Sequence, residues 1–481
     1  MILPYLILSL YIIIGTAIVV SSRRLLKKGD PIDYFIASHN ISGVVSALTY
    51  AATTYSAFMM IGLVGLAYAT GIGALGFELA YLVSTLILLS FIGPLLWSKC
   101  RIKRYVSPAE YLSERYKGKI VGAIAAIIML VALIPYASIQ IIGPSLILER
   151  TSNGTIPYIV AVIIATILSI IWSLIGGLRG IAWTDAFQGI IMLSSAIAIV
   201  VWVYIWSGNT IDYLVRVNHE VVKFPNSFWT PTVFIAYTIP WIFFAMSNPQ
   251  VVQRVFIPKN FKAYKSMVLG FAIFGLLYTI LTTILGIMLR GSSEIGIFAK
   301  IDISKRSNWN LVTPTLLTVQ EIPMVLSVIV GVSILAAAIT TIDSIALTLS
   351  SMISRDVYHK LINGDPKKEI TIGKLVLIVI CSIAALFAYI KPGFIVDLAV
   401  ASSTMLLPFA ILFIGGVLTE VGEKYCALTT IIVGFITAFV LLVLKVSILG
   451  IPSSLLVLLF SLISYSIVGY FESKVKIIKR L

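Results

Sequence analysis

Small and hydroxyl-bearing residues in the apolar run 321–351 are spaced to bind a cation. They stand at positions i, i+3, i+4 and i+7, which share one face of a helix, and they are Ala337, Thr340, Thr341 and Ser344. Hydroxyl oxygens without bulky apolar cover, together with backbone carbonyls, are the ligands that a hard cation prefers. The alternative is that each threonine hydroxyl donates back to a carbonyl of its own helix. The pattern therefore indicates either a cation site or ordinary bonding within the helix.

Two aspartates could add negative charge to such a site. Asp343, in the same run, is the only carboxylate that we expect deep in a membrane span. A carboxylate there costs several kcal/mol, so it faces the protein interior and is functional by default, a polar clamp to another helix being the alternative. Asp185 follows the turn-forming pair Gly176 and Gly177. Near the amino end of the next helix an acid could also act simply as a cap.

The helices that must position these residues are membrane spans. The 481-residue chain is 59% hydrophobic and 11% charged, whereas a soluble domain carries about 25% charged residues. A span needs about 20 apolar residues, and no long polar stretch is left for a soluble domain. We expect an all-α integral membrane protein with about thirteen transmembrane helices, at residues 2–20, 40–67, 73–97, 120–149, 157–175, 181–207, 229–247, 266–289, 321–351, 372–391, 393–416, 425–446 and 450–471.

The basic residues predict the orientation. With the N-terminus outside, 25 of the 35 Lys and Arg residues fall in cytoplasmic segments and 9 in outer ones. This is the bias of a multi-pass protein of the cell membrane with a cytoplasmic C-terminus. The net charge of +15 therefore needs no nucleic-acid partner to explain it.

Several segments together resemble the sodium:solute symporter family, which includes proline, pantothenate and sugar symporters. Segment 176–192, GGLRGIAWTDAFQGIIM, is similar to the family signature of two glycines, Thr-Asp, Gln and a closing Met. Segment 334–358 has the family's Ala-rich stretch, adjacent hydroxyl residues and final Ser-Arg-Asp-x-Tyr. Weaker matches are a cytoplasmic helix at 107–116, a fourth-span motif at 135–143 and a loop at 248–254.

The resemblance implies a single transporter domain over 1–481 with a LeuT-like fold. Its five-plus-five inverted-repeat core would occupy 40–416. An extra N-terminal helix and a basic loop would precede the core in 1–39. Two further helices and a basic tail would follow in 417–481.

The resemblance also implies the ion sites. The helix at 49–62 should be unwound at mid-membrane, although no Gly or Pro lies between Thr49 and Ala57. A sodium site would then consist of carbonyls of the second span and ligands of the ninth, namely Ala52, Tyr55, Ala337, Thr340 and Thr341. Thr340, Asp343 and Ser344 stand at i, i+3 and i+4, and the resemblance places Asp185 near this face. We therefore expect a second cation site or exit path at Asp185, Asp343 and Ser344.

The family fold places the solute beside the break. The candidate contacts are Tyr55, Ser56, Met59, Tyr136, Gln140 and Trp241, although each aromatic could equally be core packing. Met59 stands where sugar-transporting relatives carry glutamine, and no Lys or Arg joins the set. These features favour an amino acid such as proline, or a monocarboxylate, over a sugar or a multiply charged anion.

The expected function is sodium-coupled symport of a small organic solute by alternating access, without enzymatic activity. Its partners would be the solute, sodium and membrane lipid, with no obligate protein partner. One alternative is a proton-coupled carrier in which Asp343 or Asp185 titrates. A membrane-embedded enzyme is a remote alternative, because His39, His219 and His359 all lie outside or at the edges of the spans.

We expect a reporter fused after Leu481 to lie in the cytoplasm and one fused before Met1 to lie outside, because of the uneven Lys and Arg distribution. Compartment-specific reporter activity in whole cells measures both positions. Two ends on the same side would contradict an odd number of spans.

Overall fold

Helices form the whole regular structure of the residues described. The computed structural model describes residues 2–24, 29–152, 154–390, 393–444, 446, 448 and 450–478, and among these it contains no β-strand beyond one isolated bridge between Ile41 and Pro258. Long apolar runs in lipid can satisfy their backbone groups within a helix, because no water is available to bond them. The all-helical fold is thus the expected outcome.

The chain begins with α1 (Ile2–Arg23), α2 (Pro31–Ile36) and η1 (Ala37–His39). The next segment, up to residue 207, contains α3 (Gly43–Thr54), η2 (Phe58–Leu63), α4 (Val64–Thr70), α5 (Gly73–Phe91), α6 (Gly93–Lys103), α7 (Pro108–Arg115), α8 (Lys119–Thr151) and α9 (Tyr158–Ser207).

The middle of the chain contains α10 (Thr210–Arg216), η3 (Glu220–Val222), α11 (Pro231–Ile242), α12 (Phe244–Ser247), α13 (Pro249–Phe256) and α14 (Phe261–Glu294). The remainder contains η4 (Arg306–Leu311), α15 (Val312–Leu316), α16 (Met324–Met352), η5 (Ile353–Leu361), η6 (Pro366–Lys368), α17 (Glu369–Tyr389), α18 (Ile395–Leu418), α19 (Lys424–Ala438), η7 (Phe439–Val443) and α20 (Ser453–Ile478).

Ten of the described helices are long and apolar enough to cross a membrane, or eleven if the bent pair of α3 with η2 and α4 forms one span. Helix α9 has 50 residues and is interrupted at Gly177, whose φ of 52° and ψ of −163° are not helical. At 1.5 Å per residue it is about 75 Å long, more than twice the hydrocarbon thickness. Division of α9 into two spans, and a further span from α11 with α12, would give thirteen, and that number stays a prediction.

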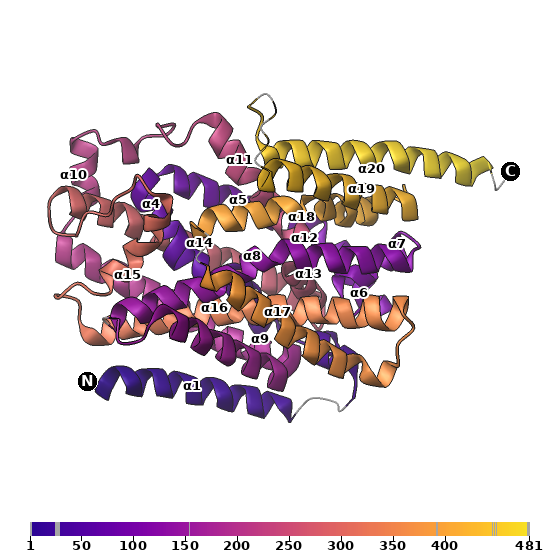
Figure 1. The fold of residues 1–481 in the computed structure, drawn as a ribbon, viewed down its shortest axis with the longest axis horizontal. Coiled ribbons are helices and arrows are strands. Elements are labelled where there is room, and N and C mark those ends of the chain that lie inside the picture. Colours follow the sequence, from indigo (N-terminus) through magenta and orange to yellow (C-terminus); the bar gives the residue numbers. More distant parts are fainter. Residues whose placement is uncertain are drawn as a thin grey trace.

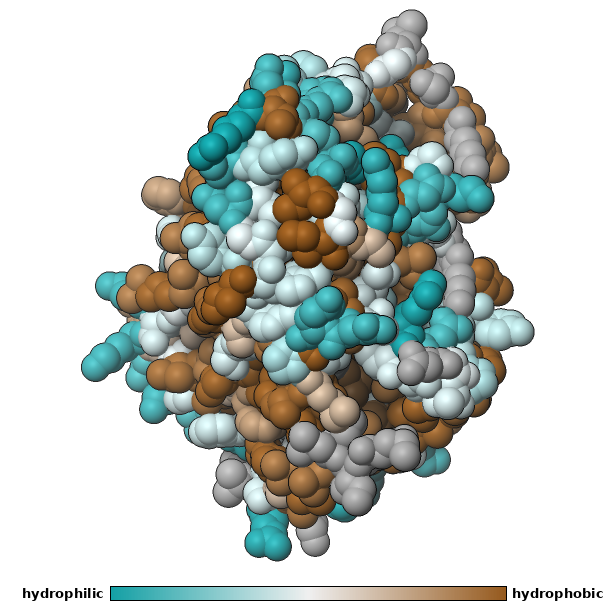
Figure 2. Space-filling model, turned by 90° about the vertical axis from the view of Figure 1, so that its left-hand side faces the viewer, coloured by the Kyte–Doolittle hydropathy of each residue, from teal (hydrophilic) through white to brown (hydrophobic). Residues whose placement is uncertain are grey.

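The two ends of the bundle carry the two ends of the chain. In Figure 1, α1, α8, α16 and α20 run along the same direction; α1 begins at one end of the molecule and α20 finishes at the opposite end. Figure 2 shows the end at which α1 begins, with many hydrophilic side chains among the hydrophobic ones. Along the sides, large apolar residues of the outer helices are exposed, such as Leu386 of α17 and Ile467 of α20. This is the surface expected of a protein solvated by lipid.

Two helices are broken near the middle of the bundle. Helix α3 ends at Thr54, and the axis turns by 48° before η2 begins. Tyr55, between them, has φ −91° and ψ 82°. Helix α11 contains Pro240 and ends at Ile242, before the short α12. These breaks free backbone groups inside the bundle, where they must find partners.

One expectation about a connection was wrong. Residues 248–254 resemble a loop of the family, but Pro249–Phe256 form the helix α13, and its residues are buried. Proline at the first helical position and the extended Asn248 before it start the helix. The segment thus delivers Arg254 to the protein interior. The predicted helix at 107–116 is confirmed as α7, where the Ser107 hydroxyl accepts a hydrogen bond from the Glu110 N–H.

Candidate ion and solute sites

The break after α3 faces the hydroxyl-bearing side of α16. The Thr340 Oγ1 donates to the Ala52 carbonyl and lies 2.8 Å from it, and it is also 2.8 Å from the Ala337 carbonyl of its own helix. The Thr341 Oγ1 is 3.1 Å from the Thr53 carbonyl and 3.4 Å from the Ala52 carbonyl. Four of the five residues predicted for sodium are therefore joined by hydrogen bonds. The fifth, Tyr55, is the capping residue at the end of α3.

The alternative of helix-internal bonding is also realised. Thr341 Oγ1 lies 3.2 Å from the Ala337 carbonyl four residues earlier. The same hydroxyl therefore touches its own helix and the broken one. Because carbonyls at a helix break have lost their partners in the chain, the hydroxyls of α16 satisfy groups that would otherwise be unpaired.

A buried arginine lies next to this cluster, and sequence analysis did not single it out. Arg254 of α13 donates from Nε to the Thr49 hydroxyl at 3.2 Å and from a terminal nitrogen to the Ser344 hydroxyl at 2.5 Å. That terminal nitrogen is 3.7 Å from the Asp185 carboxylate. Asp185 in turn accepts a hydrogen bond of 2.5 Å from Thr49. One guanidinium thus connects α3, α9, α13 and α16.

The capping role considered for Asp185 is wrong. Asp185 lies eight residues beyond the break at Gly177, and its partners are the side chains of Thr49 and Arg254. A carboxylate so deep in α9 cannot bond to unpaired amide groups at a helix start. Asp185 therefore links α9 to α3 and α13 inside the bundle.

Asp343 is buried on a different side of α16. Its neighbours are Ser173 of α9 and, more distantly, Asp185 and Arg254, and its Oδ1 has no hydrogen-bond partner in the part of the chain that the structure describes. Tyr11 of α1 lies close to both aspartates and accepts a hydrogen bond of 2.6 Å from Gln188. The structure thus brings Ser344 and Asp185 together around Arg254, while Asp343 lies beside them without joining the hydrogen-bonded cluster.

The six residues predicted to contact the solute lie around the break and are all nearly inaccessible. Tyr136 lies within hydrogen-bonding reach of Ser56. The rings of Phe58 and Trp241 are 5.6 Å apart, and Phe244 contacts both Tyr136 and Trp241. Met59 is buried in η2, directly after the break. Residues from α8, α11 and the broken helix therefore meet at one place.

The side-chain amide of Gln140 also forms hydrogen bonds within the protein. Its Oε1 accepts a hydrogen bond from the Ala57 N–H at 3.3 Å, and its Nε2 donates to the Tyr136 carbonyl at 3.2 Å. The Ser56 hydroxyl accepts from the Phe58 N–H at 3.1 Å. Gln140 and Ser56 therefore satisfy the amide groups freed at the start of the second half of the broken helix.

The expectation that Asp343 is the only carboxylate deep in a span was wrong. Glu78 of α5 is only 1% exposed and lies beside Trp241, with Tyr55 and Tyr136 nearby. A charged residue near the start of the apolar run 73–97 was the signal that could have found it. Arg254 was not predicted as a buried residue, because the sequence of its segment predicted a loop between spans and not a membrane helix.

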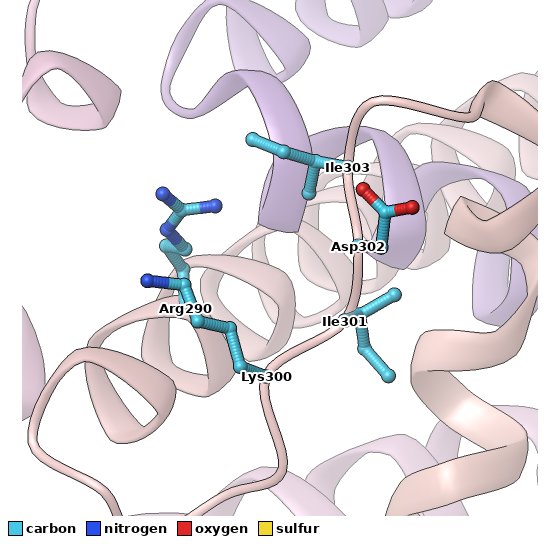
Figure 3. A pocket seen from close by; sticks show the side chains of 5 residues that line it. All are labelled: Arg290, Lys300, Ile301, Asp302 and Ile303. Carbon is cyan, nitrogen blue, oxygen red and sulfur yellow. The ribbon is translucent and has the colours of Figure 1, made fainter.

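A surface cavity elsewhere does not fit a solute site. It is lined by Arg290 of α14 and by residues 300–303 of the loop that follows (Figure 3). The Arg290 Nε is 3.0 Å from the Glu294 carboxylate and the Lys300 amine is 3.9 Å from it. The two positive charges of this hollow are thus already paired with the same carboxylate of the protein.

The sequence matches a known protein family over most of its length. The model of the sodium:solute symporter family matches residues 34–469. The chain belongs to the sodium:solute symporter family. The sodium/pantothenate symporter of Haemophilus influenzae is 24% identical over 96% of this chain and 95% of its own length. The osmoregulated proline transporter OpuE of Bacillus subtilis is 22% identical over 77% of this chain and 75% of its own.

A solved structure confirms the fold. A sodium-coupled sialic acid symporter, in a substrate-bound outward-open state, superposes with a TM-score of 0.81 over 97% of this chain and 98% of its own, at 19% identity. The chain is therefore a multi-pass membrane transporter that couples solute movement to sodium, and not an enzyme. The family and function inferred from segments 176–192 and 334–358 are confirmed.

Removal of the buried guanidinium should leave Asp185 unpaired. We expect Arg254→Met to lower the free energy of unfolding by about 3–5 kcal/mol, the cost of breaking a buried ion pair from one side. In the Asp185→Asn background the same substitution should cost much less. Thermal unfolding of the four purified proteins in detergent provides the double-mutant cycle. Additive losses would show that the two side chains act independently.

Proposed function

We propose that sodium binds between α3 and α16, on the carbonyl oxygens of Ala52, Tyr55 and Ala337 and the hydroxyl oxygens of Thr340 and Thr341. The observation that carries this proposal is the contact of Thr340 Oγ1 with the carbonyls of Ala52 and Ala337, each at 2.8 Å. Three oxygens from two helices converge there without a charged side chain among them. Oxygen ligands of this kind suit a hard cation.

Sodium bound between α3 and α16 would stabilise one conformation of the broken helix. Ala52 and Tyr55 belong to the end of α3, and Tyr55 and Ser56 join it to η2 and to the solute residues. An ion that prefers the conformation in which the two helices are close shifts the protein toward that conformation. By linkage, it also strengthens solute binding in that state. This is the coupling that symport by alternating access requires.

The solute site in this proposal consists of Tyr55, Ser56, Met59, Tyr136, Gln140 and Trp241. Aromatic rings, a hydroxyl, a thioether and an amide form a small, largely apolar site with few polar groups, as in most sites for small molecules. The names of relatives include pantothenate and proline, which supports an organic solute of that size. We propose an amino acid such as proline, or a monocarboxylate.

A second cation site or exit path would use Asp185, Asp343 and Ser344. One support is the buried Oδ1 of Asp343, which has no partner among the residues that the structure describes. Another is the pair of hydrogen bonds that join Thr53 to Ser344, at 2.9 Å, and Thr49 to Asp185. Arg254 supplies one positive charge against two carboxylates. One negative charge would then remain for a mobile cation or proton.

The proposal also includes the setting of the site. The N-terminus lies outside and the C-terminus in the cytoplasm. The core spans 40–416, after an extra helix within 1–39 and before two further helices within 417–481. Lipid surrounds the bundle, and no obligate protein partner is needed for transport.

Thr341→Ala removes one proposed sodium ligand. Loss of a hydroxyl ligand is worth about 1–3 kcal/mol, so the sodium concentration for half-maximal uptake should rise roughly 5- to 150-fold. Thr341→Ser retains the oxygen and should change it little. Uptake into reconstituted vesicles, titrated with sodium, measures both variants.

The matched control is Thr166→Ala. Among the described residues, this buried hydroxyl bonds only back to its own helix, at 2.7 Å from the Val162 carbonyl. Its sodium titration should match the wild type. If Thr341→Ala also matched the wild type, Thr341 would be a helix-internal donor and the proposed site would be wrong.

Asp343→Asn keeps the size of the side chain and removes its charge. If a second cation binds there, the variant should show a lower Hill coefficient or a lower apparent affinity for sodium. The measurement is the same sodium titration, repeated over a range of pH. Unchanged sodium dependence with a shifted pH optimum would instead support the proton-coupled alternative.

A further inference from the structure

Glu78 projects from the buried face of α5 into the group of solute residues. Phe77, Tyr81, Leu82 and Thr85 are buried on the same helix, so this side faces the interior. The Glu78 Oε2 atom has no hydrogen-bond partner among the described residues. The indole of Trp241 is the hydrogen-bond donor beside the carboxylate. Glu78 thus presents an unsatisfied acceptor toward the place where the solute is expected.

The surroundings of Glu78 are aromatic. Tyr81 contacts Tyr55 at 5.9 Å between ring centroids and Phe244 at 5.7 Å, while Phe77 contacts Trp241 at 5.3 Å. Ring faces attract a positive charge, most strongly where water is excluded. Several aromatic rings around one carboxylate therefore form a site of negative potential.

No positive side chain neutralises this carboxylate. Among the described residues Glu78 forms no ion pair, and Arg254 belongs to the separate cluster with Asp185. A buried carboxylate without a cation or a proton costs far more than a paired one. Either a proton or a positively charged group of the cargo has to balance it. The proposed sodium ligands contain no acid, so sodium there has no direct contact with Glu78.

We propose that Glu78 receives a protonated amino group of the solute, so that the transported solute is a zwitterion or cation and not a simple carboxylate. This inference rests on the proposed solute site and narrows it. Glu78 forms the hydrogen bond to the ammonium, and the rings of Tyr55, Tyr81 and Trp241 enclose it. An acid with no amine would instead place two negative charges together in a water-poor site, which is unfavourable.

Matched probes with and without the amine test the inference. They are L-proline against cyclopentanecarboxylate, and β-alanine against propionate. Thermal stabilisation of the purified protein in saturating sodium reports binding to the native state. We expect each amine-bearing probe to bind roughly 10- to 150-fold more tightly than its deaminated partner, as for a hydrogen bond to a charged group. Glu78→Gln should remove this preference, whereas Glu78→Asp should retain part of it.

Glu420→Gln, at an exposed position near the end of α18, is the matched control and should leave the preference unchanged. Sodium alone should still stabilise Glu78→Gln, which shows that the variant is folded. The inference is wrong if no amine-bearing probe binds, if the deaminated probes bind equally well, or if Glu78→Gln keeps the preference.

These outcomes separate the inference from the proposed function. If solute stabilisation depends on sodium and Thr341→Ala weakens that dependence, the symport proposal holds whatever the probes show about Glu78. If neither sodium nor Thr341 affects binding of any probe, the proposed sodium site itself is wrong.

Discussion

The structure depends on how the backbone groups freed at the break in the second span are satisfied. In lipid a helix normally satisfies its own amides and carbonyls, and each group left unpaired costs several kcal/mol. At Tyr55 and Ser56 this internal pairing stops. Side chains of other helices replace it: Thr340 and Thr341 bond the carbonyls, and Gln140 bonds an amide. The hydroxyl pair of α16 and the glutamine of α8 therefore stabilise the broken helix.

This requirement explains which parts of the site the sequence could reveal. The i, i+3, i+4 spacing of Ala337, Thr340 and Thr341 follows from helix geometry and needs no structure. The break itself has no local signal, because the sequence from Thr49 to Ala57 contains neither Gly nor Pro. It is stabilised by tertiary hydrogen bonds, so only the resemblance to a family indicated it. The apolar runs, by contrast, predicted an all-helical membrane protein. The turn-forming pair Gly176 and Gly177 also predicted the interruption between residues 157–175 and 181–207, where the backbone at Gly177 is not helical.

Two charged residues escaped prediction for a different reason. Glu78 lies in an apolar run and Arg254 in a short amphipathic segment. Neither position in the sequence indicates which side chains of other helices contact the residue. Pairing decides their roles: Arg254 has Asp185, Thr49 and Ser344 as partners, whereas Glu78 has an indole and aromatic rings. Arg254 is thus held by side chains of three other helices, although its Nη1 has no partner among the described residues, whereas Glu78 has no cation beside it and keeps one carboxylate oxygen without a partner there. A buried polar atom without a partner has to be satisfied by a ligand, a proton or a water molecule.

The broken helix also has an electrostatic consequence. Each half-helix carries a macrodipole, with partial negative charge at its carbonyl end and partial positive charge at its amide end. The carbonyl end of the 12-residue α3 is directed to the proposed sodium site. The amide end of the second half, which begins at Phe58, starts among the solute residues. A single interruption of the chain thus presents opposite helix poles to the proposed sodium site and to the proposed solute site.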